Sequence, residues 1–355
     1  MAETQKSSPV PGRGASINPP NRFEKLSYEP DPDQADAVQS APKTQYLRDT
    51  SKSIIAYNDS PDIPFDASIN PYRGCEHGCI YCYARPTHEF LGFSAGLDFE
   101  TRILVKEDAP ELLYQELSSR KWKPQILVMS GVTDPYQPIE SRLQITRRCL
   151  QVLADFRNPV GIVTKNHLVT RDIDVLKRLA EFNAVAVNVS VTTLDSKLAH
   201  IMEPRTSPPE RRLRAIEELA SAGIPVGVMA APIVPGLTDH EITSIIAAAA
   251  RAGAREAGYV VLRLPYAVAG LFENWLSQHF PQRKKKILDH IRDLRDGKLN
   301  DPEFSSRMRG HGAYADQIRS MFILACKKAG IPSSRSSLST EHFRRPPGDQ
   351  PSLFE

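Results

Sequence analysis

Three cysteines within eight residues constrain this chain more than any other feature of its sequence. The stretch Cys75-Glu-His-Gly-Cys79-Ile-Tyr-Cys82 has a C-x3-C-x2-C spacing, which places three thiols on one short loop. Gly74 and Gly78 permit the tight backbone turns that such a loop needs. Iron–sulfur clusters are held by cysteine thiolates, normally four to a cubane. Three thiolates leave one iron without a protein ligand, and an open coordination position is what catalysis at a metal requires.

Two other interpretations of the three cysteines are open. A disulfide with one free thiol is not expected in a chain whose first residues do not begin a signal peptide, because cytosolic thiols stay reduced. A structural zinc site needs a fourth ligand, for which His88 is better placed than His77, since His77 lies between two of the cysteines. The number and softness of the thiolates favour a cluster. A zinc-stapled nucleic-acid-binding protein is the alternative, and it would be colourless.

The composition predicts one sizeable core between two tails. The chain has 355 residues, of which 41% are apolar, and this leaves little for a second full domain. Residues 1–47 and 331–355 are rich in Pro and Ser without sustained periodicity, and we predict that both are disordered. The formal net charge of +3 neither requires nor excludes a nucleic-acid partner. No apolar run approaches the length of a membrane span, so we expect a cytoplasmic protein without membrane contact.

Strand-like apolar runs alternate with segments of helical periodicity between the tails. The runs, which suit strands buried on both faces of a parallel sheet, are Ile103–Val105, Gln125–Met129, Val160–Val163, Ala184–Val191, Pro225–Met229 and Tyr259–Leu262. The helical segments are Ala109–Ser119, Ile139–Phe156, Thr170–Phe182, Pro209–Ala222 and Asp239–Ala252. Repeated βα units imply right-handed crossovers and either a barrel or an open doubly wound sheet. About six units are too few for the eight of a complete barrel.

Polar side chains follow five of these runs at the point where each run ends. Chemistry collects beyond the carboxyl ends of parallel strands. The residues found there include Ser130, Thr133, Asp134, Lys165, Ser190, Thr192, Arg205 and Arg263. Strand ends are polar in any case, so a single example is weak evidence. Five in succession, joined by the cysteine loop, predict a site.

The cysteine stretch resembles the signature of a known enzyme family. C-x3-C-x2-C with an aromatic residue directly before the last cysteine, here Tyr81, is typical of the radical S-adenosylmethionine (SAM) enzymes. The surrounding residues, Asn70–Pro86, resemble the branch related to spore photoproduct lyase and to DNA repair photolyases. More narrowly, they resemble a bacterial subgroup of that branch without an assigned substrate. The resemblance extends from about Arg48 to Gly330.

The resemblance implies a fold and its boundaries. The family uses a partial (β/α)6 barrel, which decides between the two sheet arrangements left open above. We therefore expect an α/β, TIM-like partial barrel over residues 48–266. The family often closes the open side of its barrel with helices, and we expect a helical C-terminal extension over residues 267–330. Its predicted helices are Ala267–Phe280, Arg283–Arg295 and Ala313–Ala329.

The resemblance also implies cofactors and a reaction. Cys75, Cys79 and Cys82 would bind a [4Fe-4S] cluster, and the amino and carboxylate groups of SAM would chelate its remaining iron. An electron, supplied by a partner such as flavodoxin or ferredoxin, would cleave SAM to methionine and a 5′-deoxyadenosyl radical that abstracts hydrogen from the substrate. The cofactors carry this lyase-like chemistry, and the protein positions them and excludes water. Family analogy alone favours a nucleic-acid base as the substrate.

Four residues would contact the adenosine part of the cofactor by their positions in the family's motifs. Tyr81 would lie near the adenine, and Ile233 would pack on it. Ser190 and Thr192 would reach the ribose. Ser190 also lies inside an apolar run, where its hydroxyl has the alternative of bonding the neighbouring backbone.

Five residues would contact the methionine part. Ser130, Thr133 and Asp134 occupy the place where family members meet the amino group, and the Asp134 carboxylate suits an ammonium. Lys165 or Arg205 would meet the carboxylate, which arginine grips bidentately. Ordinary structural roles are the alternatives: Asp134 precedes a proline and suits a turn, Lys165 suits a solvated rim, and Arg205 suits an exposed ion pair.

The remaining cysteines bear on the reaction. Cys149 and Cys326 lie among apolar residues at helical spacing, and we predict buried, inert thiols. The spore photoproduct lyase pattern has a hydrogen-donor cysteine after the second strand, where this chain reads Met129–Asp134 without a cysteine. This difference argues against the same thymine-dimer reversal, and Tyr136 is a candidate replacement donor. A non-catalytic iron–sulfur protein for electron transfer or sensing is the second functional hypothesis.

Overall fold

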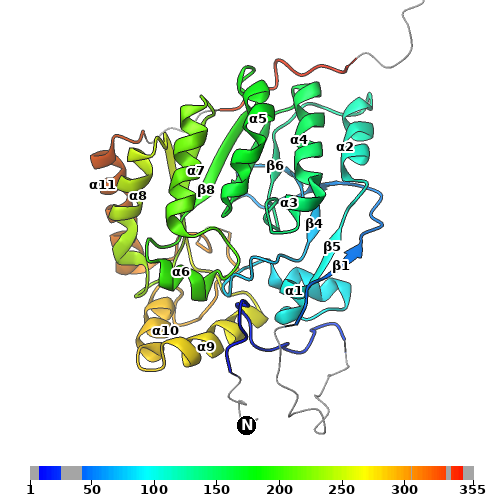
Figure 1. Ribbon diagram of the computed structural model, residues 1–355. Helices are drawn as coiled ribbons and strands as arrows, with labels where there is room; N and C mark the ends of the chain where they lie inside the picture. The colour runs from blue at the N-terminus through cyan, green and yellow to red at the C-terminus, as the bar shows by residue number, and fades with distance from the viewer. Residues whose placement is uncertain (1–7, 25–41, 305, 333–336, 347–355) are drawn as a thin grey trace, which may run out of the picture.

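A parallel β-sheet forms the centre of the protein (Figure 1). The computed structural model describes residues 8–24, 42–304, 306–332 and 337–346, and within them this sheet has seven strands in the order β10-β9-β8-β7-β6-β3-β2. All neighbours pair in parallel except β2, which is antiparallel to β3. The strands are β2 (Ile55–Tyr57), β3 (Ala67–Ile69), β6 (Leu127–Met129), β7 (Val160–Thr164), β8 (Val185–Ser190), β9 (Val226–Ile233) and β10 (Glu256–Val261).

Helices follow the strands, and the longer ones, α2, α4, α5, α7 and α8, cover the outer face of the sheet (Figure 1). The helices are η2 (Arg85–Leu91), α1 (Leu97–Thr101), α2 (Ala109–Ser118), α3 (Glu140–Leu143), α4 (Ile145–Phe156), η3 (His167–Asp172), α5 (Ile173–Ala180), α6 (Ser196–Met202), α7 (Pro209–Ser221), η4 (Asp239–Glu241) and α8 (Ile242–Arg251). Branched residues such as Ile162, Val187 and Val228 are fully buried between the helices and the barrel interior. The βα repeat and the parallel sheet confirm the predicted partial barrel.

The first parallel strand is not the predicted one. The run Ile103–Val105 falls in β5 (Arg102–Val105), which belongs to a separate three-stranded sheet with β1 (Gln45–Arg48) and β4 (Tyr72–Arg73). The short strand β3 takes its place and leads directly toward the cysteine loop. Three residues, Ala-Ser-Ile, are too few to show an apolar pattern, so pairing with β2 and β6 rather than sequence defines this strand.

Two predicted helices are interrupted. The segment Ile139–Phe156 forms α3 and α4, because Gln144 between them adopts a left-handed backbone with φ of 53°. The segment Thr170–Phe182 begins inside the 3-10 turn η3, whose N-cap is Asn166. The helix α6 has no counterpart in the sequence prediction. Helix propensity therefore located these helices, while local turn chemistry decided where they begin and end.

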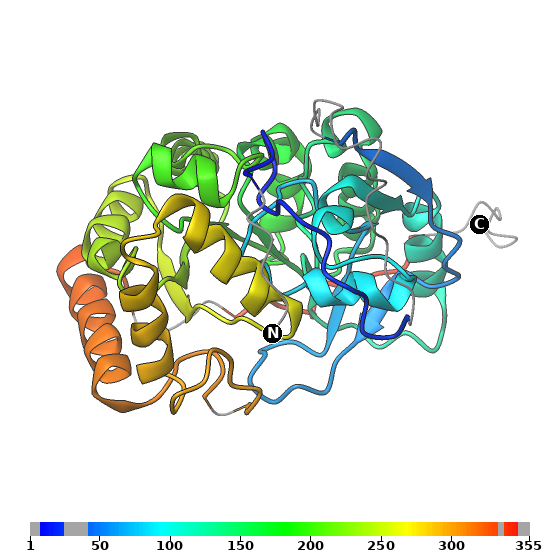
Figure 2. The same ribbon diagram turned by 90° about the horizontal axis from the view of Figure 1, so that it is seen from below.

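Three helices extend the barrel at its carboxyl-terminal end, as predicted. They are α9 (Ala267–His279), α10 (Lys284–Asp293) and α11 (Gly312–Ala329). Figure 2 shows α9 lying across the face that holds the cysteine loop, and Phe272 and Trp275 of α9 share an apolar cluster with Cys79. Helix α11 packs instead on α8. Across the described part of the chain, every helix is too short or too polar to span a membrane.

An ion pair joins the two ends of the open sheet. Arg307, in the segment between α10 and α11, donates to Asp62 through Nε at 2.6 Å and Nη2 at 2.5 Å. Asp62 lies in the connection between β2 and β3, at the opposite edge of the sheet from β10. The amide of Val261 donates to the carbonyl of Met308 at 2.9 Å, which fixes the same segment on β10. The two connections lie side by side in Figure 2 and close the seam of the partial barrel.

Parts of both predicted tails pack on the barrel, so the prediction of disorder is wrong for them. Residues 8–24 run over the cysteine loop, and the amides of Gly14 and Ala15 donate to Glu100 at 3.0 and 2.8 Å. Residues 42–47 lead into and begin β1. Near the other end, the amide of Arg344 donates to the carbonyl of Phe156. Residues 8–24 and 337–346 form no helix or strand of their own, so they have no periodicity to detect. Residues 1–7, 25–41, 333–336 and 347–355 of the two predicted tails lie outside the described residues.

Candidate active site

The cysteine loop lies at the carboxyl ends of the parallel strands. Cys75 and Cys79 are buried and Cys82 is half-buried, and all three are free thiols. Three hydrogen bonds hold the loop, each from a backbone amide of the loop to a different element. The Cys75 amide donates to the Phe99 carbonyl at 2.9 Å, the Ile80 amide donates to the Met202 carbonyl at 3.0 Å, and Gln137 Oε1 accepts from the Glu76 amide at 3.0 Å. The loop is thus tied to α1, α6 and the connection after β6.

A buried ion pair supports the loop from behind. Arg85 donates to the carbonyl of Cys79 at 2.9 and 3.0 Å and to that of Gly78 at 3.2 Å. The same guanidinium contacts Glu100 at 2.5 Å. Neither residue was singled out from the sequence, because their pairing across fifteen residues is a tertiary contact. Arginine supplies five donors in a fixed fork, which lets one side chain fix several loop carbonyls at once.

Burial disfavours the charged form of two of the thiols on the cysteine loop. Burial, aided by the neighbouring carboxylate of Glu203, raises the pKa of Cys79 well above its usual value. Burial and the neighbouring Cys75 raise the pKa of Cys82 to about 11. Bound iron would supply the positive charge that these thiolates lack. In a cubane each cysteine binds a different iron, so the sulfurs need not converge on one ion. Among the described residues, no three His, Cys, Asp or Glu side chains are arranged around a single ion.

His88, the fourth ligand considered for zinc, is a core residue. Its ring packs against Phe93 and Phe99, with centroid distances of 5.2 and 5.5 Å. Burial lowers the pKa of His88 to about 4. Its ring is therefore neutral and forms part of the support behind the cysteine loop.

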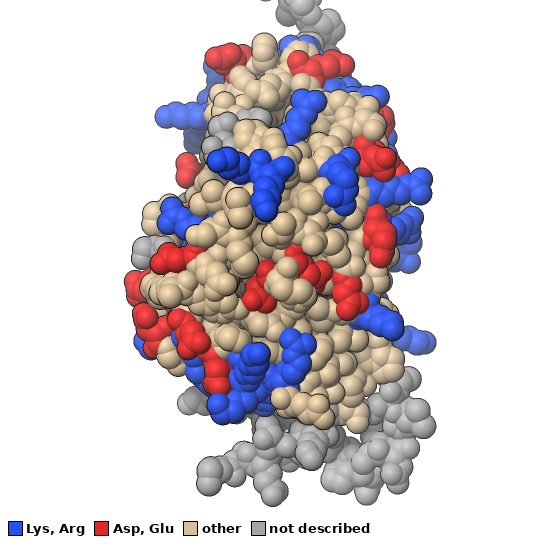
Figure 3. All heavy atoms as spheres, turned by 90° about the vertical axis from the view of Figure 1, so that its left-hand side faces the viewer, with Lys and Arg blue, Asp and Glu red and all other residues tan. Residues whose placement is uncertain are grey.

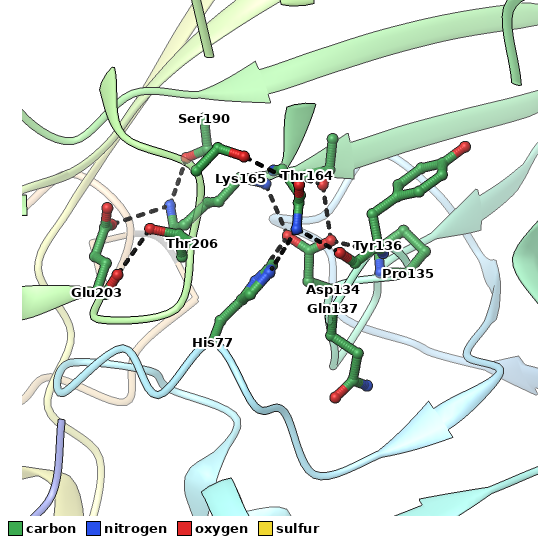
Figure 4. A network of polar contacts seen from close by, with 12 residues as sticks. His77, Asp134, Pro135, Tyr136, Gln137, Thr164, Lys165, Ser190, Glu203 and Thr206 are labelled. Atoms are coloured by element: carbon green, nitrogen blue, oxygen red, sulfur yellow. Dashed lines mark hydrogen bonds and ion pairs between the residues drawn. The ribbon is translucent and has the colours of Figure 1, made fainter. Parts of the chain in front are cut away.

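Asp134 joins three elements around the cysteine loop (Figure 4). Its Oδ1 accepts from the Thr164 hydroxyl at 2.7 Å and from the Tyr136 amide at 2.9 Å. Its Oδ2 accepts from the Lys165 amide at 2.7 Å and lies 3.3 Å from Nδ1 of His77. Burial opposes the charge, but His77 and these donors keep the pKa of Asp134 below its usual value. Both carboxylate oxygens of Asp134 thus have protein partners. The hydrogen bond from the Tyr136 amide also closes the turn that was the structural alternative for Asp134.

His77 contributes to this network from within the cysteine loop. Its Nε2 lies 3.3 Å from Nδ2 of Asn166, which follows β7, and its carbonyl accepts from the Arg205 amide. Burial disfavours the charged ring, but Asp134 and Cys75 raise the pKa of His77 to about 10. The sequence analysis considered His77 only as a metal ligand. Its contacts with Asp134 and Asn166 instead connect the cysteine loop to the end of β7.

Lys165 and Ser190 meet at the rim formed by the ends of β7 and β8. The Lys165 ammonium donates to Ser190 Oγ at 2.7 Å and to the Ala231 carbonyl at 3.0 Å, and it lies 3.7 Å from Glu203 (Figure 4). Burial lowers the pKa of Lys165 to about 8, even though the thiol of Cys79 acts in the other direction. Lys165 is therefore not the solvated rim charge considered as its alternative. The Ser190 hydroxyl also donates to the Ala231 carbonyl at 2.9 Å, so its backbone alternative is realised.

Tyr81 and Thr192 meet at the same carboxylate. Thr192 Oγ1 donates to Glu203 at 2.7 Å, and the Tyr81 hydroxyl donates to the same Oε1 atom. On its other side, Glu203 pairs with the buried guanidinium of Arg212. Burial raises the pKa of Glu203, against the opposing charge of Arg212. The sequence analysis did not select Glu203 or Arg212 as site residues, although Glu203 stands two residues before the predicted Arg205.

The other predicted contacts are distributed around this centre. Ser130 is half-buried with a positive φ of 94°, directly after β6. The Thr133 hydroxyl donates to the Tyr72 carbonyl at 3.0 Å, so it holds the backbone before the cysteine loop. Arg205 contacts Glu76 at 3.1 Å, which matches its alternative as an ion pair. Ile233, at the end of β9, is buried in the core.

Tyr136 and Cys149 do not face this site. Tyr136 is fully buried, its hydroxyl donates to Asp172 at 3.2 Å, and Figure 4 shows its ring pointing away from His77 and Lys165. Tyr136 as a replacement hydrogen donor is therefore wrong. Burial raises the pKa of Cys149, which fits the predicted inert thiol. Cys326 is half-buried in α11, away from the cysteine loop.

Comparison with known proteins agrees with this geometry. A model of the radical SAM superfamily matches residues 69–249. An uncharacterized protein of Mycobacterium tuberculosis is 34% identical over 250 residues, which cover 70% of this chain and 72% of that protein. A protein of Pseudomonas phage M6 named radical SAM Nalpha-GlyT isomerase is 23% identical over 247 residues, which cover 69% of this chain and 49% of that protein.

Solved structures show the same fold. Spore photoproduct lyase complexed with dinucleoside spore photoproduct superposes with a TM-score of 0.58 at 16% identity, over 80% of this chain and 79% of that one. A mutant of that lyase with bound AdoMet and the same ligand gives a TM-score of 0.52, also at 16% identity, over 80% and 78% of the two chains. The partial barrel, the three cysteines at its rim and the family match together lead to one conclusion. This chain belongs to the radical SAM superfamily and is an enzyme.

Proposed function

We propose that this enzyme binds one [4Fe-4S] cluster through Cys75, Cys79 and Cys82 and cleaves SAM reductively to a 5′-deoxyadenosyl radical. The observation that carries the proposal is the placement of three free thiols on one loop at the carboxyl ends of six parallel strands. The donor set fits the cluster, because three soft thiolates leave one coordination position for a substrate or cofactor. When bound, the cluster supplies the electron that cleaves SAM, delivered by a donor such as flavodoxin or ferredoxin.

The residues of the chain would bind SAM around Lys165. Its ammonium, held by Ser190 and the Ala231 carbonyl, is a point charge for the carboxylate of the methionine. Tyr81 and Thr192 would border the adenosine. Tyr81 and Thr192 already donate hydrogen bonds to Glu203, so these side chains are held in place before the cofactor binds.

Residues farther from Lys165 would support this pocket. Asp134 would position the cysteine loop through His77 in addition to any contact with the amino group of the methionine. Thr133 would hold the backbone at Tyr72, which precedes the cysteine loop. Ser130, directly after β6, would contact the amino group of the methionine. Arg205 would anchor the loop through Glu76, and Ile233 would border the adenine from the end of β9.

The substrate we propose is a nucleic-acid base. Spore photoproduct lyase, with which this chain shares its fold, has a dinucleoside as its bound ligand. This enzyme lacks a cysteine at residues 129–134, so it would return the hydrogen by another path. We therefore propose that this enzyme acts on a nucleic-acid base, but not that it reverses the same thymine dimer as spore photoproduct lyase.

Cofactor cleavage tests the proposal. The protein is reconstituted anaerobically with iron and sulfide, reduced with dithionite and given SAM, and 5′-deoxyadenosine is measured. We expect a brown protein that forms 5′-deoxyadenosine. The triple variant Cys75→Ala, Cys79→Ala, Cys82→Ala should bind no cluster and form none, whereas Cys149→Ala, which removes a thiol outside the site, should behave like the wild type.

Two outcomes would contradict the proposal. A colourless protein that retains zinc after purification would favour the zinc alternative. A brown, fully reconstituted protein that forms no 5′-deoxyadenosine with single-stranded or double-stranded DNA or RNA present would favour electron transfer or sensing instead.

A further inference from the structure

Arg263 is a half-buried cation without an ion-pair partner in the described part of the chain. It follows β10 by two residues, and its Nη1 donates to the sulfur of Met308 at 3.6 Å. Its Nε is buried without a hydrogen-bond partner. A guanidinium has five N–H donors, and a charged group taken from water normally finds an opposite charge. Among the described residues, Arg263 has no carboxylate within ion-pairing distance.

The guanidinium lies at the rim that holds the cysteine loop. Its central carbon is 5.5 Å from the ring centroid of Tyr83, the residue that follows Cys82. The Tyr83 hydroxyl donates to the Gly131 carbonyl at 3.0 Å, in the connection after β6. Arg263 is held there by its backbone, because the Leu262 amide and carbonyl are both hydrogen-bonded. The unsatisfied cation therefore faces the mouth of the proposed site from a rigid strand end.

Asp62 is one of the two carboxylates whose charges act on Arg263, and it is already paired. Asp62 accepts two hydrogen bonds from Arg307, at 2.6 and 2.5 Å, and both of these side chains are 13% exposed. Burial and the like charge of Arg307 lower the pKa of Arg263. A ligand that brings a negative charge to Arg263 would relieve both effects. An anionic group bound beside Tyr83 would supply the counter-charge that Arg263 lacks among the described residues.

Exposed aromatic rings lie beside Arg263 and Arg307. Tyr83 is 49% exposed, and Phe304, whose ring lies 4.5 Å from the guanidinium carbon of Arg307, is 47% exposed. Arginines beside exposed rings are the combination that binds single-stranded nucleic acid, since the rings stack on bases and the guanidinium grips phosphate. By contrast, the face formed by α8, α10 and α11 carries intermixed charges of both signs (Figure 3).

We infer that Arg263 binds a phosphodiester group of the substrate while Tyr83 stacks on an adjacent base. This inference rests on the proposed function and deepens it, because it names the group by which a nucleic-acid substrate is held. A single phosphodiester contact predicts recognition of a dinucleotide step rather than of a free base.

Binding of a dinucleotide with one phosphate tests the inference. The reconstituted enzyme with SAM is titrated with thymidylyl-thymidine and with its methylphosphonate analogue, whose linkage is uncharged. We expect the wild type to bind the charged form more tightly, by roughly tenfold or more for a charge-assisted bidentate contact. Arg263→Gln should lose that preference and bind both forms equally. Arg263→Lys should retain part of it, because the charge remains without the fork.

A matched control is Arg309→Gln. Arg309 is an exposed arginine in the same segment as Met308, but its guanidinium stacks on Tyr259 beside α11, at 3.8 Å from the ring centroid. This variant should bind both dinucleotides like the wild type. Equal binding of the two forms by the wild type, or an equal loss in Arg309→Gln, would overturn the inference. Inorganic phosphate that displaces the dinucleotide at equal concentration would also overturn it, since stacking would then add nothing.

Cofactor cleavage separates this inference from the proposed function. In the wild type, 5′-deoxyadenosine formed without substrate measures the proposed function, and binding of the dinucleotides measures this inference. If the wild type forms 5′-deoxyadenosine but binds neither dinucleotide, the phosphodiester site is wrong and the radical chemistry stands. If the wild type forms none, the proposed function itself fails.

Discussion

Arg85 and Glu100 form an ion pair of 2.5 Å in which both side chains are 0% exposed, directly behind the cysteine loop. Arg85 binds the carbonyls of Gly78 and Cys79, and Glu100 binds the amides of Gly14 and Ala15. The pair therefore connects the loop to the N-terminal segment that covers it. A buried pair rarely adds much stability over an apolar core, but it specifies one arrangement of its neighbours.

Glu100→Gln should weaken both the fold and the loop. Loss of one charge leaves Arg85 buried without a counter-ion, which costs about 3–5 kcal/mol. We expect a lower free energy of unfolding by urea and less iron retained per protein after reconstitution. Glu111→Gln is the control, because Glu111 lies 3.8 Å from Arg148 with both side chains exposed, and such pairs contribute about 0–1 kcal/mol. Equal losses in the two variants would contradict the prediction.

His88 should make the stability depend on pH. Burial lowers its pKa to about 4 from the ordinary value of 6.5. Between these values the unfolded chain binds a proton that the folded protein does not, so stability falls as the pH drops through this interval, by about 3 kcal/mol in total.

His88→Leu should remove this contribution. Its free energy of unfolding should fall less than that of the wild type between pH 6.5 and pH 4, as measured by urea denaturation at several pH values. His200→Gln, at an exposed position, is the control and should keep the wild-type slope. Parallel curves for His88→Leu and the wild type would show that His88 is not the source.

Gly14→Ala should displace the segment that covers the cysteine loop. A Cβ atom at Gly14 would lie 1.8 Å from the Gly78 carbonyl oxygen, which leaves no room for it. We expect faster proteolysis within residues 8–24 and faster loss of iron in air. Gly270→Ala in α9 is the matched control, since its Cβ would meet nothing within 4 Å. Wild-type proteolysis in Gly14→Ala would mean that the segment is held by its other contacts alone.

Arg307→Gln should loosen the seam of the barrel. The bidentate contact with Asp62 is lost, and hydrogen bonds to charged groups contribute about 1.5–3 kcal/mol. We expect faster amide hydrogen exchange at Val261, whose amide donates to Met308, and around Asp62. Asp155→Asn, which breaks an exposed pair with Arg178, should leave exchange at Val261 unchanged. Unchanged exchange in Arg307→Gln would show that the seam closes without this pair.

The fold class was predictable because its signal is local. Parallel strands such as Val160–Thr164 and Val185–Ser190 are buried on one face and at least half-buried on the other, so their apolar runs stand out against the amphipathic helices between them. The strand Ala67–Ile69 was missed because it owes its conformation to its two neighbours. The run Ile103–Val105 was correctly predicted as a strand and assigned to the wrong sheet, since a sequence pattern does not name a pairing partner.

The candidate site was predictable in part for the same reason. Lys165, Ser190 and Thr192 follow their strands closely, so the topology of a parallel sheet alone brings them together. Asp134 and Arg205 stand where predicted, but their charges are engaged by His77 and Glu76. Sequence position indicates which side chains reach the rim. It does not indicate which of them already have a partner.

The sequence by itself determined the spacing of the three thiols and the βα repeat, because cysteine spacing and strand periodicity are properties of neighbouring residues. Only the tertiary structure decided which charges are paired: Arg85 with Glu100, Arg307 with Asp62, and Arg263 with none among the described residues. Charge pairing depends on distances across the folded chain, which the order of residues in the sequence does not give.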